Sequence, residues 1–184
     1  MRRLFIVVFL AFAALFAASA TQPPSTLQVK GMGWGKCPCD IVLNDGDYWG
    51  GSIWLTLDGK EFLEGVWSGQ DGTDTWAGPG EAFGTGKNGV YTYAFNKLPD
   101  GTYADTFVAH IPIATFSLPP GLMGFGTYQG PHHIVSGTGR FKHAKGMIAV
   151  SGTYVWGPAA GGTVEVGYFS PEYTGFINNV LPAK

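Results

Sequence analysis

Glycine constrains this chain more than any other residue type. The 184 residues include 29 glycines with no three-residue period, and they separate short runs rich in Val, Ile, Thr, Tyr, Phe and Trp. Such runs favour strands, whereas the intervening Gly, Asn, Asp and Pro favour turns. No segment shows a helical apolar period of useful length. The sequence therefore predicts an all-β domain of roughly eight to ten short strands, spaced as in a sandwich or a barrel.

Turn signals predict several hairpins and one interruption. Pro112, Pro119 and Pro120 lack the amide hydrogen that a central strand needs, so we expect 111–123 to be an edge strand or a long loop. The expected hairpins join 52–57 to 61–67 through Asp58-Gly59, 90–95 to 103–110 through Pro99-Asp100-Gly101, and 147–156 to 163–169 through Gly161-Gly162, while Asn88-Gly89 opens the strand at residue 90.

The first twenty residues have the pattern of a secretory signal peptide. Arg2 and Arg3 precede an apolar run over 4–18, and Ala18-Ser19-Ala20 is a small-residue cleavage site. The run is shorter than the roughly 20 residues that span a bilayer. We therefore expect a protein secreted after cleavage near Ala20, with no membrane span; the alternative is an uncleaved amphipathic helix.

Beyond the signal peptide, the sequence predicts one domain. We expect an N-terminal arm at 21–39, the β-barrel domain at 40–177, and a frayed tail at 178–184. The arm carries Cys37-Pro38-Cys39. A secreted chain favours oxidation, so a local disulfide staple is the preferred interpretation, with an intermolecular bridge or two thiols as alternatives.

Charge and hydrophobicity limit the partners. Without Arg2 and Arg3 the chain has nine basic residues against thirteen acidic ones, which argues against nucleic-acid binding. Charged residues make up 13% and aromatic residues 15%. In 90–95 neither alternating face carries a charge. A strand covered on both faces fits a barrel within an oligomer or a barrel with an apolar lumen.

One segment resembles a known family. Residues 134–146 read Ile-Val-Ser-Gly-Thr-Gly-Arg-Phe-Lys-His-Ala-Lys-Gly and resemble the glycine-rich turn of the allene oxide cyclase and dirigent superfamily. The matching residues are Gly137, Thr138, Gly139, Arg140, Phe141, Ala144 and Gly146. The resemblance implies a single eight-stranded antiparallel β-barrel, a trimer or another homo-oligomer such as a dimer, and an apolar cavity.

The same resemblance implies a function. Its members hold a small apolar organic molecule and steer its cyclisation or isomerisation, with no metal or organic cofactor. We therefore expect a cofactor-independent cyclase or isomerase that restricts the conformers of its ligand and offers a proton donor. The alternative is a non-catalytic secreted barrel that binds a small ligand or a glycan, or that has a structural role.

Histidines and acids are the candidate polar groups of such a cavity. His132 and His133 are adjacent, so a strand points them to opposite faces and only one can enter the lumen. The two cannot bind one metal from that strand, and no carboxylate stands at a matched spacing, so we expect no metal site. His110, Asp105 and Glu165 are the other candidate catalytic residues. The ordinary pKa of an imidazole suits proton transfer at neutral pH, and a carboxyl in an apolar lumen acquires a raised pKa. Asp105 and His110 are alternatives, because a regular strand points residues five positions apart to opposite faces.

Aromatic residues are the candidate walls. The chain has more aromatic side chains than the core of a small barrel requires, so we expect some of them to line a cavity. The candidate ligand-binding residues are Tyr91, Tyr93, Phe107 and Trp156.

Overall fold

The computed structural model describes residues 26–41, 43–44, 48–70, 72–76, 83–117, 125–158 and 165–183. Over this part of the chain nine strands follow one another, with a short 3-10 turn, η1, before the last two. The elements are β1 (Thr26–Cys37), β2 (Trp49–Leu57), β3 (Glu61–Gln70), β4 (Thr73–Trp76), β5 (Phe83–Lys97), β6 (Tyr103–Ser117), β7 (Phe125–Thr138), η1 (Gly139–Phe141), β8 (Lys145–Pro158) and β9 (Glu165–Asn178).

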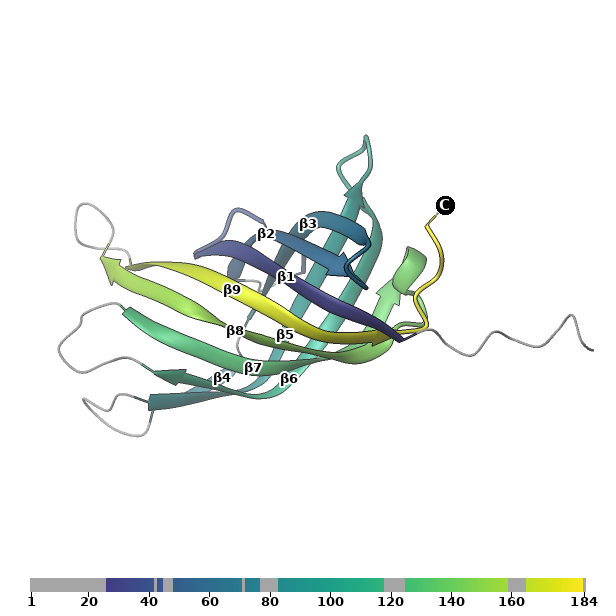
Figure 1. Cartoon of the computed structure of the whole chain (residues 1–184). Coiled ribbons are helices and arrows are strands. Elements are labelled where there is room, and N and C mark those ends of the chain that lie inside the picture. The colour runs from purple at the N-terminus through teal and green to yellow at the C-terminus, as the bar shows by residue number, and fades with distance from the viewer. Residues whose placement is uncertain are drawn as a thin grey trace, which may run out of the picture.

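The strands form a closed antiparallel barrel with eight positions (Figure 1). Their order is β3-β2-β1-β9-β8-β7-β6-β5, and β3 pairs with β5 to close the sheet. The short β4 also pairs with β5, beyond the end of β3, so that β3 and β4 share one position. This architecture confirms the predicted all-β fold and the single eight-stranded barrel.

The turn chemistry explains two hairpins. Asp58 and Gly59 have φ of 52° and 64°, and Gly101 has φ of 89°, the left-handed values that Asp, Asn and Gly tolerate best. The hairpins β2–β3 and β5–β6 are therefore confirmed. Gly161-Gly162 lies outside the described residues.

Asn88 does not open a strand, contrary to the prediction. It lies inside β5 with φ of 60°. β5 pairs with β4 up to Lys87 and with β3 from Val90 onwards. The Asn-Gly pair therefore marks the point where β5 changes partner, and its left-handed residue permits this break within a continuous strand.

Two other boundaries differ from the sequence-based expectation. The residues predicted as an N-terminal arm contain β1, which pairs with both β2 and β9, so the barrel begins at Thr26. The segment 111–123, predicted as an edge strand or a long loop, is strand β6 as far as Ser117, between β5 and β7, and residues 118–124 lie outside the described part. Pro112 is tolerated because it lies where the β6–β7 register shifts, between His110 and Thr115, and its missing amide hydrogen interrupts no regular ladder there.

The interior of the barrel is packed with aromatic rings. Trp67, Tyr93, Phe95, Phe107 and Phe141 are each at most 1% exposed. Phe107 stacks on Tyr93 with ring centroids 4.7 Å apart, and Phe141 from η1 packs edge-on against Phe107 at 5.2 Å. The η1 turn therefore closes one end of the barrel with an aromatic plug.

The outer face of β5 is covered by the chain itself. Thr92 and the opposite residue Ser68 are buried although they face outward. The Leu43 amide donates to Ser68 Oγ at 2.9 Å, and the Asn44 side chain donates to Thr92 Oγ1. The β1–β2 connection thus explains why 90–95 is apolar on both faces, without a partner subunit at this place.

Other parts of the outer surface are apolar and exposed. Phe125, Val155 and Tyr168 lie opposite one another on β7, β8 and β9, and each is between 46% and 48% exposed. Trp34 of β1 contacts the Tyr168 ring. The expected homo-oligomer stays a prediction. The described residues contain no helix long and apolar enough to cross a membrane.

Candidate functional site

The centre of the barrel holds a buried histidine between two tyrosines. His132 lies on β7 and is 2% exposed. Its Nδ1 is 2.6 Å from the Tyr93 hydroxyl, and its Nε2 is 3.0 Å from the Tyr128 hydroxyl. Tyr128 and His132 stand four positions apart on one strand and therefore share its inner face, whereas Tyr93 reaches across from β5. Both ring nitrogens of His132 are thus hydrogen-bonded.

Burial fixes the charge state of this group. Burial, with a smaller contribution from the neighbouring His133, lowers the pKa of His132 from 6.5 to about 3. Burial also raises the pKa of Tyr93 and of Tyr173 well above 10.0. At neutral pH the imidazole and these phenols are therefore all uncharged.

A neutral imidazole has one donor and one acceptor nitrogen. One of the two tyrosines therefore donates to His132 and the other accepts from it. Both hydrogen bonds of this chain can point in one direction, which polarises the terminal hydroxyl more than an isolated phenol. The arrangement provides a polarised, uncharged donor inside an apolar barrel.

Aromatic side chains surround the histidine. Tyr91 lies 5.2 Å from its ring, and Tyr173 packs edge-on against Tyr93 at 6.0 Å. Three of the four predicted wall residues therefore face the interior, namely Tyr91, Tyr93 and Phe107. The side chain of the fourth, Trp156, lies outside the described residues.

Three further aromatic side chains lie at one end of the barrel. Phe116, Tyr128 and Phe169 lie near the ends of β6, β7 and β9 that are remote from η1, and they are 6% to 9% exposed, more than most interior residues. A Cβ at Gly130 would lie only 3.0 Å from the Tyr128 hydroxyl, so the glycine lets this hydroxyl pack closely against β7. Tyr128 is the member of the hydrogen-bonded chain nearest to this end.

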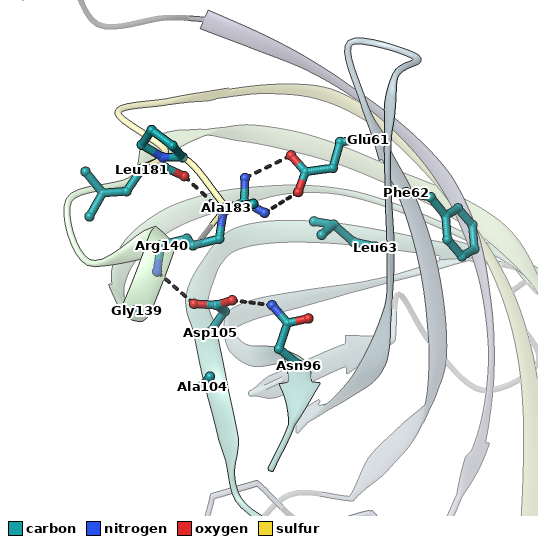
Figure 2. A pocket seen from close by; sticks show the side chains of 11 residues that line it. Glu61, Phe62, Leu63, Asn96, Ala104, Asp105, Gly139, Arg140, Leu181 and Ala183 are labelled. Atoms are coloured by element: carbon teal, nitrogen blue, oxygen red, sulfur yellow. Dashed lines mark hydrogen bonds and ion pairs between the residues drawn. The ribbon is translucent and has the colours of Figure 1, made fainter.

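The opposite end carries Asp105, another predicted site residue. Asp105 is 6% exposed and shares the inner face of β6 with Phe107. One of its carboxylate oxygens accepts the Arg140 amide at 2.8 Å and the other accepts the Asn96 side chain (Figure 2). Asp105 therefore points inward, as predicted, but it fastens the β7–β8 turn to the barrel rather than facing His132.

A cavity of about 540 Å³ lies beside this carboxylate. The Arg140 guanidinium forms a two-point ion pair with Glu61 and donates from Nε to the Leu181 carbonyl at 2.9 Å (Figure 2). The Leu181 amide in turn donates to the Arg140 carbonyl at 2.9 Å. The predicted frayed tail is thus hydrogen-bonded to the base of the barrel, and the charged groups around the cavity are already paired with one another.

The remaining predicted site residues lie elsewhere. His110 was a candidate for the inward polar group only as an alternative to Asp105. The structure has Asp105 inward, and His110, flanked by the buried Ala109 and Ile111, faces outward. His133 also faces outward, next to the inward His132. The Glu165 side chain lies outside the described residues. The sequence-based reasoning missed Tyr128 and Tyr173; the period-2 spacing of Tyr128 and His132 was the signal for the first of them.

The two cysteines form no staple. Cys37 and Cys39 are both thiols, with Cys37 buried, and Cys39 Sγ donates to the Ile41 carbonyl at 3.0 Å. The preferred local disulfide is therefore wrong, and an intermolecular bridge stays a prediction.

Comparisons with known proteins add no relative. The chain matches no protein-family model, no curated protein and no solved structure. The resemblance of 134–146 to the allene oxide cyclase and dirigent superfamily stays a prediction. Functional inference therefore begins from the buried histidine and its two tyrosines.

Proposed function

We propose that this barrel binds a small apolar organic molecule and steers its cyclisation or isomerisation without a cofactor. The observation that carries the proposal is the chain Tyr93–His132–Tyr128 within an aromatic interior. Ligand sites are typically apolar with a few placed polar groups, and this centre has that composition. The N-terminal pattern supports secretion as the setting of this activity.

The proposed chemistry uses an uncharged hydrogen-bond donor. Tyr93 donates to Nδ1 of His132, Nε2–H donates to Tyr128, and the Tyr128 hydroxyl donates to an oxygen of the ligand. As negative charge develops on that oxygen during ring closure or isomerisation, the aligned chain stabilises it. The high pKa of Tyr93 and the low pKa of His132 keep both groups uncharged, so the chain acts by hydrogen bonding rather than by net proton release.

The aromatic walls supply the second contribution. Tyr91 and Phe169 flank the polar chain, and Phe116 contacts Tyr128 at 5.5 Å. Rigid rings around a flexible ligand restrict it to few conformers, which lowers the entropic part of a cyclisation barrier. In this proposal, conformer restriction and one polarised hydroxyl together steer the cyclisation or isomerisation of a reactive intermediate.

Binding can be tested first. Native mass spectrometry of the purified protein should reveal a co-purified small molecule. An apolar fluorescent naphthyl ketone serves as a defined probe, and its emission should shift to the blue as the carbonyl enters the barrel. Tyr128→Phe should weaken ketone binding by about tenfold, the value of one hydrogen bond of about 1.4 kcal/mol.

Tyr103→Phe is the matched control, because it makes the same chemical change on β6 at the opposite end of the barrel from Tyr128 and should leave the affinity unchanged. With the co-purified molecule in hand, Tyr128→Phe should also lower its turnover. Equal binding and turnover in both variants would remove Tyr128 from the site. Binding without turnover in the wild-type protein would favour the non-catalytic ligand-binding alternative, and absence of any binding would exclude both.

A further inference from the structure

Two outward-facing histidines and a methionine lie side by side on the outer surface of the barrel, on the opposite face of the sheet from His132. His110 of β6 lies directly opposite His133 of β7. His133 lies directly opposite Met147 of β8. The pairing therefore brings together three side chains that are 14 to 37 positions apart in the sequence.

The alternation of burial shows that all three share the outer face. Ala109 and Ile111 on either side of His110 are buried, as are His132 and Ile134 on either side of His133. Ile148, which follows Met147, is buried as well. Neighbours of an inward residue on a strand point outward, so the two imidazoles and the thioether form one row across three strands.

The spacing of this row suits coordination. Residues directly opposite each other in antiparallel strands have Cβ atoms about 4.5–5.5 Å apart. Two imidazoles at that separation converge on one ion at bonds of about 2 Å. The flexible Met147 side chain on the far side of His133 approaches the same ion, because methionine has three rotatable bonds. Among the described residues, no group of three or more His, Cys, Asp and Glu competes as a metal site.

We propose that His110, His133 and Met147 form a surface site for copper(I). All three donors are uncharged, and the outward Lys145, two positions before Met147, adds a positive charge nearby. A thioether is a soft ligand that selects copper(I) over zinc, magnesium or calcium. The exposed apolar neighbours Val90 and Phe176 at the two ends of the row keep the surroundings of the ion poorly hydrated.

The experiment is an anaerobic titration of the full chain with copper(I) in ascorbate, followed by nuclear magnetic resonance of labelled side chains. We expect the imidazole signals of His110 and His133 and the ε-methyl signal of Met147 to shift together. His143 and Met32 are matched controls in the same sample, because both side chains are exposed and lie outside the row. The thiols of Cys37 and Cys39 also bind copper(I), so the titration continues beyond the amount of copper that they take up. The signals are read residue by residue, so that binding at the thiols is distinguished from binding at the row.

A variant separates a shared site from three independent contacts. His133→Gln changes an exposed side chain, so the melting temperature should not change. In this variant the copper-induced shifts of His110 and Met147 should be lost. Met147→Leu should weaken the shifts of both histidines, because the soft ligand is removed. Shifts that persist at His110 and Met147 without His133 would overturn the proposal, as would wild-type signals that stay in place or that move no more than those of His143 and Met32.

Discussion

Acid is expected to destabilise the barrel by about 3 kcal/mol between pH 6.5 and pH 4 through His132 alone. The folded protein holds this imidazole neutral, with a pKa of about 3, whereas the unfolded chain protonates it near 6.5. Between these two values the unfolded state binds one proton more than the folded state. The stabilisation is therefore complete above pH 6.5 and is lost as the pH falls toward 3.

The measurement is the free energy of unfolding in urea at several pH values between 7 and 4. In the wild-type protein the contribution of His132 has a slope of about 1.4 kcal/mol per pH unit. His132→Gln is the control, because an amide has both a donor and an acceptor for Tyr93 and Tyr128 but does not titrate in this range. The difference between the two proteins isolates His132 from all other titrating groups. Parallel pH profiles would contradict a neutral, buried His132.

The neutral state of His132 also limits its role in the proposed function. A histidine that stays neutral down to about pH 3 cannot serve as a charged acid at neutral pH. The chain Tyr93–His132–Tyr128 is therefore suited to orienting and polarising, and its catalytic contribution lies in hydrogen bonding to the ligand. A ligand that bears a carbonyl or ether oxygen on an apolar skeleton fits this centre best.

The fold could be predicted because its signals are local. The turn pairs Asp58-Gly59 and Asp100-Gly101 are adjacent residues with positive φ at one or both positions, and the period-2 pattern of Tyr91, Tyr93 and Phe95 identifies their shared face. Signals of this kind depend only on neighbours in the sequence. The exceptions, such as Asn88 within β5, arise where a strand changes its partner, and partner exchange leaves no local pattern.

The sites were harder to predict because they depend on register. The inward direction of His132 could not be chosen over that of His133 until the burial of its neighbours was known, and neither could that of Asp105 over that of His110. The direct pairing of His110 with His133 follows a one-residue register shift between Val108 and Ala109. A bulge of this kind reassigns every cross-strand neighbour beyond it. The argument from adjacent histidines against a metal site considered one strand and could not include this pairing.

Replacement of Gly139 by alanine should destabilise the barrel by about 3 kcal/mol, through two effects that a matched control separates. Gly139 has φ of 53°, which is unfavourable for a residue with a Cβ. An added Cβ would also lie 2.1 Å from the Asp105 carboxylate and 2.3 Å from the Ala104 carbonyl. Because one of these contacts is backbone, the turn itself must move, and the Asp105 bond to the Arg140 amide then weakens.

Gly59→Ala is the control for the backbone effect alone. Gly59 has a similar φ of 64°, but a Cβ there meets no atom within 4 Å. We expect this variant to lose about 1 kcal/mol, the cost of a left-handed alanine. Urea unfolding of both variants at pH 7 gives the two values, and their difference measures how tightly Asp105 and the η1 turn close the end of the barrel. Equal losses would mean that the turn yields without cost and that Asp105 does not fasten it.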